Sequence, residues 1–218
     1  MSGRKARDGR HAVRDTAGVH DPALFTDPEN WTGGFYELSL EIGDPDDGRR
    51  QRALTALWRA AAVTGCCGGR DREPADQPAA PLTTASLEEF GHLHGVARPP
   101  LGGPVVCGCF STCFEDTEDW LTLYLPLGAL ARVDRRIGGF PFGPDGEPRS
   151  LAWRAPLDTW LVGVADEVFR QVDFRIGLVG FEVDHTTAAE LGGVVPGQRR
   201  NGYLLPVGGR LEYTPANR

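Results

Sequence analysis

The chain has 218 residues, of which 40% are hydrophobic and 24% charged, a composition that suits a hydrophobic core without disulfide support. The formal net charge of −7 argues against a surface for nucleic-acid phosphates, which needs clustered positive charge. Lys5 is the only lysine and lies in the polar N-terminal stretch, which excludes Schiff-base, P-loop and kinase-type lysine chemistry from the folded part.

Arginine supplies the remaining basic residues, and glycine and proline are abundant, a pattern that fits a GC-rich genome. The arginine content is therefore weak support for anion binding. No apolar run follows the charged N-terminus, and no stretch approaches the roughly 18 apolar residues of a membrane helix. We expect a soluble, cytoplasmic protein whose five cysteines are reduced.

The N-terminal stretch and the first strand differ sharply in pattern. Residues 1–24 show no periodicity and predict a disordered tail, whereas residues 25–218 predict a single α+β domain. Residues 35–42 alternate strictly and predict a strand with one buried face and one face that is wet or free of helices. The buried set is Tyr36, Leu38, Leu40 and Ile42, and the other set is Glu37, Ser39 and Glu41.

A helix is predicted directly after this strand, with Asp44 as its N-cap and Leu54, Leu57 and Trp58 on its buried face. Residues 65–83 predict a loop, with a short strand near residues 64–67. A short helix is expected from Ser86 onward, with Gly95 as its stop signal.

The second half of the chain predicts a hairpin of strands over residues 105–110 and 120–125, and then a helix over residues 156–172. Residues 174–183 predict a long strand, and residues 203–207 and 211–213 predict short edge strands. This order indicates an α+β fold in which two main helices pack on one face of a mainly antiparallel sheet. Strand–helix units near both ends leave two ferredoxin-like halves as an alternative.

Cysteine and histidine residues form the sharpest candidate site, and they are Cys66, Cys67, His92, His94, Cys107, Cys109 and Cys113. Thiolates and imidazoles are ligands that zinc prefers in tetrahedral sets, and Cys107 and Cys109 would share a face of a strand. No C-x2-C pair occurs, so buried reduced thiols are the competing interpretation. A nucleophilic cysteine paired with His92, His94 or His185 also stays open.

Carboxylates and aromatic residues provide weaker candidates. Glu115, Asp116, Glu118 and Asp119 crowd one predicted turn, which indicates a solvated turn, with acid–base work or a basic partner as alternatives. Glu182, Asp184 and His185 are interpreted as the end of the last long strand. Trp120 and Tyr124 share one strand face and form either an exposed contact patch or a surface under a helix.

Three stretches, residues 31–38, 119–130 and 180–183, resemble an uncharacterised family of actinobacterial proteins, and the resemblance covers roughly residues 25–185. It implies a bacterial origin and no particular activity. The strand–helix layout is also similar to immunity proteins of bacterial toxin systems, a likeness of architecture alone.

Motifs with a defined chemistry are missing from the sequence, which has no H-E-x-x-H, no G-x-S-x-G and no G-x-G-x-x-G after a predicted strand. We therefore predict a non-catalytic cytoplasmic binding or regulatory protein that acts through protein–protein contacts, of which an immunity protein is one version. We assign no catalytic, cofactor-binding or metal residue, and we expect another protein as partner, with no cofactor, nucleic acid or membrane. The alternative is a metalloprotein or enzyme that depends on the cysteines and histidines.

Overall fold

Two helices lie across one face of an antiparallel sheet in the computed structural model, which describes residues 24–25, 27–69, 76–114, 118–137 and 147–218. The strands are β1 (Phe35–Gly43), β2 (Thr64–Cys67), β3 (His92–Ala97), β4 (Val105–Phe114), β5 (Glu118–Pro126), β6 (Ile176–Phe181), β7 (Gly202–Val207) and β8 (Arg210–Thr214). The helices are η1 (Pro28–Trp31), α2 (Asp47–Ala60), α3 (Thr84–Phe90), α4 (Leu127–Val133), α5 (Glu147–Phe169) and α6 (Ala188–Leu191).

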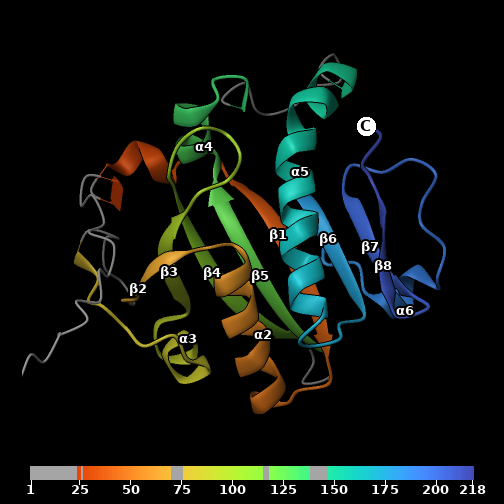
Figure 1. The fold of residues 1–218 in the computed structure, drawn as a ribbon, viewed down its shortest axis with the longest axis horizontal. Helices are drawn as coiled ribbons and strands as arrows, with labels where there is room; N and C mark the ends of the chain where they lie inside the picture. The colour runs from red at the N-terminus through yellow and green to blue at the C-terminus, as the bar shows by residue number, and fades with distance from the viewer. Residues whose placement is uncertain (1–23, 26, 70–75, 115–117, 138–146) are drawn as a thin grey trace, which may run out of the picture.

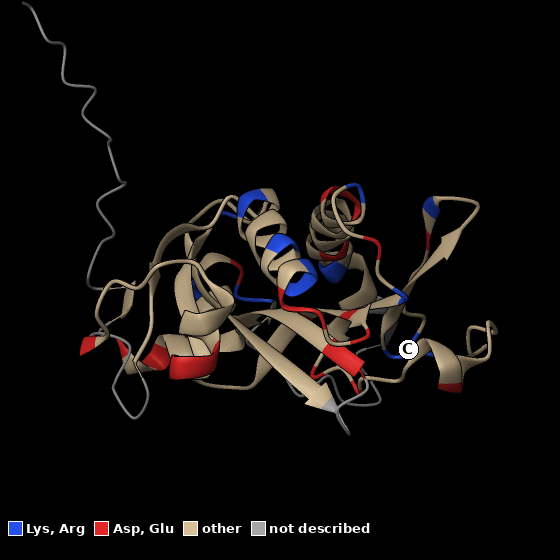
Figure 2. Cartoon of the chain, turned by 90° about the horizontal axis from the view of Figure 1, so that it is seen from below, with Lys and Arg blue, Asp and Glu red and all other residues tan. Residues whose placement is uncertain are grey.

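The described strands form one eight-stranded sheet in the order β2-β3-β4-β5-β1-β6-β7-β8, and neighbouring strands run antiparallel. The long helices α2 and α5 lie side by side on one side of it (Figures 1 and 2). The predicted α+β arrangement of two main helices on an antiparallel sheet is thereby confirmed. No helix among the described residues is long and apolar enough to cross a membrane.

The first strand, β1, lies in the middle of the sheet and supplies the centre of the core. Its residues Tyr36, Leu38, Leu40 and Ile42 point toward the helices and are fully buried, as their alternation predicts. From α2, Leu54 and Leu57 pack against this face because they recur at the helical period. Residues 1–23 of the predicted tail lie outside the described residues. Leu24, the last residue of that tail, packs against the core.

The opposite face of β1 was predicted to be wet or free of helices, and both alternatives are wrong, because this face is buried and the short helix α6 packs over part of it. Glu37, Ser39 and Glu41 are all buried. A segment of residues 182–191, here called the strap, packs over part of this face and includes the short helix α6. The strap covers carboxylates because its backbone N–H groups satisfy them, which a hydropathy pattern does not reveal.

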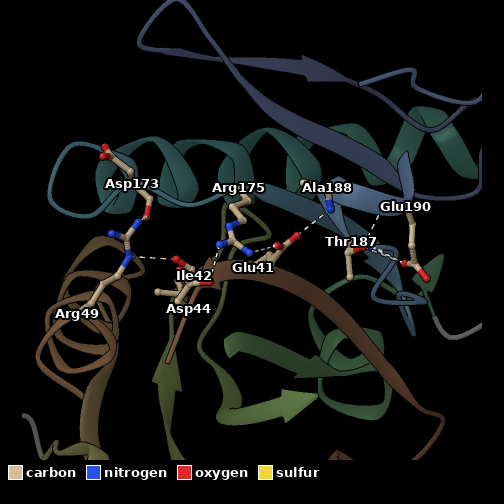
Figure 3. Close-up of polar contacts among 9 residues, drawn as sticks. All are labelled: Glu41, Ile42, Asp44, Arg49, Asp173, Arg175, Thr187, Ala188 and Glu190. Carbon is tan, nitrogen blue, oxygen red and sulfur yellow. Dashed lines mark hydrogen bonds and ion pairs between the residues drawn. The ribbon is translucent and has the colours of Figure 1, made fainter. Parts of the chain in front are cut away.

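Glu41 connects the strap to the sheet through a hydrogen bond, as Figure 3 shows. One carboxylate oxygen accepts a hydrogen bond from the backbone N–H of Ala188 at 2.8 Å, in the first turn of α6. The other oxygen lies 3.4 Å from one guanidinium nitrogen of Arg175, and a second guanidinium nitrogen of Arg175 pairs with Asp44 at 2.7 Å. A capping box between Thr187 and Glu190 completes the start of α6.

Several boundaries differ from those predicted. The N-cap of α2 is Asp46 and not Asp44, so the helix begins one half turn later. Helix α5 begins at Glu147, and Pro156 lies inside it, because the burial of residues on both sides of the proline outweighs the lost N–H bond. The predicted short helix ends at Phe90, and residues 92–97 form the strand β3 instead.

Polar side chains under α5 fix this helix to the sheet. The Tyr36 hydroxyl donates to the Asp158 carboxylate, and Nε of Arg154 donates to the same hydroxyl oxygen at 3.0 Å. A second guanidinium nitrogen of Arg154 donates to the Arg200 carbonyl at 3.2 Å. Burial raises the pKa of both Tyr36 and Asp158. This buried network joins the helix, β1 and the segment before β7.

The acidic turn between β4 and β5 is not simply solvated, which corrects the prediction for Asp119. Its carboxylate is buried and lies 3.5 Å from a guanidinium nitrogen of Arg50 on α2. Arg50 also contacts Asp47 at 2.6 Å and Glu88 at 2.7 Å. Glu118 is half-buried, while Glu115 and Asp116 lie outside the described residues. Arg50 thus neutralises a charge that the hydrophobic core cannot solvate.

Replacing Arg50 by leucine should lower the free energy of unfolding by about 3 kcal/mol, because the Asp119 carboxylate then stays buried without its counter-charge. The Arg50→Leu/Asp119→Asn double variant should recover most of this loss. Denaturant unfolding of the four proteins in the double-mutant cycle measures both effects. Additive losses in the double variant would contradict the pairing.

Candidate functional site

Two histidines of β3 meet on the face of the sheet that is opposite the two long helices. His92 and His94 are two residues apart in a strand, so they share a face, and the intervening Leu93 points into the core. Their imidazole rings stack with centroids 6.0 Å apart and planes within 7°. Because the sequence favoured a helix here, the shared face depends on a strand that the prediction missed.

Tyr124 of β5 connects the two imidazoles through its hydroxyl group. The hydroxyl oxygen lies 3.1 Å from Nδ1 of His92 and 3.0 Å from Nε2 of His94. On the outer side of His94, its Nδ1 lies 2.7 Å from Oε1 of Gln77. A continuous chain of hydrogen bonds therefore runs from Gln77 through His94 and Tyr124 to His92.

Gly108 allows this reach across the sheet. β4 lies between β5 and β3, and Gly108 pairs with Tyr124 on one side and with His94 on the other. A Cβ atom at Gly108 would lie only 2.2 Å from the Tyr124 hydroxyl oxygen and ring. Glycine is thus required here so that the tyrosine ring can cross the middle strand and contact both histidines.

Further rings surround this chain. The Trp31 ring meets His94 edge-on at 5.2 Å, and Phe35 meets Tyr124 at 4.8 Å. Phe110 lies 5.4 Å from His92, measured between ring centroids. We call the six residues the aromatic face, and they are Trp31, Phe35, His92, His94, Phe110 and Tyr124.

Exposure is unequal within the aromatic face. His94 and Tyr124 are buried, whereas Trp31, Phe35 and Phe110 are half-buried and His92 is exposed. The hydrogen-bonded pair thus forms a base, and the partly exposed rings form a rim around it. This rim comes from three regions that are distant in sequence. They are η1 together with the start of β1, the strand β3, and the strand β4.

The aromatic face is electrically neutral at neutral pH. Partial burial of its ring lowers the pKa of His92, although its side chain remains exposed, and burial together with the neighbouring His92 lowers the pKa of His94 to about 4. Burial also raises the pKa of the Tyr124 hydroxyl. Both imidazoles are therefore uncharged and the tyrosine keeps its proton, so the face offers ring surfaces and neutral hydrogen-bonding groups.

Glu37 lies beside Tyr124 in the neighbouring strand and connects the aromatic face with the strap. One of its carboxylate oxygens accepts a hydrogen bond from the Val183 N–H at 2.8 Å. Burial raises the pKa of Glu37 from 4.5 to about 7, and the nearby Glu182 adds to this rise. Glu182 and His185 have positive φ angles of 41° and 54°, so the strap turns sharply where it leaves β6.

The predicted cysteines do not join this face as a group. Cys107 and Cys109 alternate with Gly108 and are buried on the helix side of the sheet, opposite the imidazoles. Burial raises the pKa of Cys107 to about 12 and that of Cys66 to about 11, so thiolate is scarce at neutral pH. Within the described parts of the chain, no three His, Cys, Asp or Glu side chains form a group suited to a metal ion.

Of the two alternatives for Trp120 and Tyr124, the exposed contact patch is wrong, because both side chains are buried. Trp120 lies under the strap, where His185 meets it edge-on at 5.0 Å between ring centroids. Glu182, Asp184 and His185 follow the end of β6, as predicted for a strand terminus. Sequence reasoning missed Phe35, Phe110, Trp31 and Gln77, whose meeting depends on strand order.

Comparison with protein-family models finds no match for this chain. Comparisons with curated proteins and with solved structures find no match either.

Replacing Glu37 by glutamine tests the buried carboxylate. The folded state raises the pKa of Glu37, so the native protein binds a proton more tightly than the unfolded chain, and the stability contribution of Glu37 falls as pH rises from 4.5 through about 7. Glutamine keeps an acceptor for Val183 and carries no charge. The free energy of unfolding of Glu37→Gln, relative to that of the wild type, should rise by about 2 to 3 kcal/mol between pH 5 and pH 8.

Denaturant unfolding at several pH values measures this difference. Glu212→Gln provides the matched control, because Glu212 is an exposed residue of β8. The control should follow the wild type at each pH. A constant difference between Glu37→Gln and the wild type across this range would show that Glu37 ionises normally in the folded protein.

Proposed function

We propose that this chain is a non-catalytic binding or regulatory protein of the cytoplasm and that its aromatic face holds another protein. The observation that supports this proposal is the ring of partly exposed aromatic side chains around a buried, hydrogen-bonded base. Aromatic residues dominate the binding energy of protein interfaces when they are clustered and well packed. Exposed clusters of this kind are uncommon on a surface without a binding role.

The base of the face is suited to binding because it is already ordered. Tyr124 is held by two imidazoles and by the Gly108 backbone beneath its ring. Phe35 packs edge-on against Tyr124 and Phe110 packs at a tilt against His92, so little side-chain freedom remains to be lost when a partner binds. A rigid surface of rings favours affinity more than a mobile surface of equal area does.

The chemistry of the face also favours binding over catalysis. Its imidazoles have lowered pKa values, and the buried thiols have raised ones, so at neutral pH the imidazoles supply no imidazolium acid and the buried thiols supply little thiolate nucleophile. The cysteines among the described residues are free thiols, which supports the cytoplasmic placement. The metalloprotein or enzyme alternative stays a prediction.

Phe110→Asp should abolish recovery of the partner while leaving the fold intact. The charge would enter the rim of the face, where it contacts His92 and where an incoming apolar surface would have to desolvate it. We expect at least about tenfold weaker binding, as for an interface hot spot. The measurement is recovery of a stoichiometric partner with the tagged full chain from its own cells, followed by a binding titration with the purified partner.

Val207→Asp is the matched control, since Val207 is an apolar residue of β7 that is 48% exposed and lies outside the aromatic face. It should bind the partner as the wild type does. Equal binding by Phe110→Asp, or equal loss in both variants, would contradict the proposal. Unfolding curves of both variants confirm that each remains folded.

A further inference from the structure

The hydrogen-bond chain under the aromatic face has a direction. Oε1 of Gln77 has no hydrogen, so Nδ1 of His94 must be the donor in their 2.7 Å contact. A neutral imidazole carries one hydrogen, so Nε2 of His94 is an acceptor. The Tyr124 hydroxyl therefore donates its only hydrogen to His94, over the 3.0 Å contact.

The same reasoning determines which ring nitrogen of the exposed His92 carries the hydrogen. Because the Tyr124 hydroxyl hydrogen is used by His94, its oxygen accepts from Nδ1 of His92 over the 3.1 Å contact. The neutral His92 ring then has a lone pair on Nε2. No described residue donates to this nitrogen, and the His92 side chain is exposed. The aromatic face thus presents a single fixed hydrogen-bond acceptor among its rings.

The surroundings of this acceptor restrict what can bind. Half-buried Phe110 beside His92, and half-buried Trp31 beside the neighbouring His94, offer flat, apolar ring surfaces, which favour an aromatic ring in the partner. The neutral imidazoles give no cation for a carboxylate or phosphate. A phenylalanine ring would leave Nε2 without a donor, whereas an indole N–H or a phenol O–H would satisfy it.

We infer that the aromatic face binds a tryptophan or tyrosine side chain of the partner protein, whose ring N–H or O–H donates to Nε2 of His92. This inference rests on the proposed function and names the group that the partner inserts. Tryptophan and tyrosine fit because each combines a large apolar ring with one donor, which is why they anchor many interfaces.

The tautomers provide the first test, and they need no partner. Long-range ¹⁵N–¹H correlation spectra of the ¹⁵N-labelled full chain at neutral pH report which ring nitrogen carries the hydrogen. We expect both His92 and His94 to carry it on Nδ1. A hydrogen on Nε2 of His92 would overturn the inference, because the face would then present a donor instead of an acceptor.

A matched pair of small probes provides the second test. N-acetyl-tryptophanamide has an indole N–H, and its 1-methylindole analogue has the same ring without that donor. Chemical shifts of the His92 ring, followed during titration, should give about fivefold weaker binding for the methylated probe, the size expected for one net hydrogen bond. Equal affinities, or no shift with either probe, would overturn the inference.

Tyr124→Phe removes the hydroxyl that fixes the His92 tautomer and should abolish the preference between the two probes. If this variant does not fold, Gln77→Leu removes the acceptor at the start of the same chain and should reduce the preference. A preference that persists in the folded variant would overturn the role of the chain. If the probe experiments contradict the inference but Phe110→Asp still loses the partner, the proposed function stands. The failure of the inference is therefore distinguishable from the failure of the proposed function.

Discussion

The close approach of the Tyr124 ring to the backbone of Gly108 is the contact on which the aromatic face depends. It lets a side chain of β5 pass over β4 and place its hydroxyl between two histidines of β3. Any larger residue at position 108 would push the ring away and leave His94 buried without its bond. The glycine inside the Cys107-Gly108-Cys109 motif thus determines the surface, while the two cysteines fill the core on the other side.

A second constraint is the burial of polar groups on both faces of β1. On the helix side, Tyr36 meets Asp158 and Arg154, and on the strap side Glu37 and Glu41 accept backbone hydrogen bonds. Each of these groups would be costly to bury alone, so each specifies the position of the element that satisfies it. β1 therefore fixes α5 and the strap by hydrogen bonds as well as by packing.

The sequence predicted those elements whose pattern is local. The alternation in β1, the apolar stripe of α2 and the hairpin of β4 and β5 all appear where expected, because side-chain period reports burial directly. The prediction failed for β3. The sequence suggested a short helix that ends at Gly95, whereas pairing with β4 makes this segment a strand. The aromatic face could not be predicted, because it needs the order of β3, β4, β5 and β1, which is a property of long-range pairing.

The inner end of the hydrogen-bond chain is a neutral amide and not a carboxylate. In a catalytic triad, a buried carboxylate holds the imidazole and stabilises the imidazolium that forms when it takes a proton. Here Nδ1 of His94 contacts the neutral amide of Gln77, Nδ1 of His92 contacts the Tyr124 hydroxyl, and burial disfavours a charge on His94. The hydrogen-bond chain can therefore orient His92, but it supplies no negative charge to stabilise an imidazolium formed by protonation of Nε2. Such an arrangement is suited to accepting a hydrogen bond from a bound group.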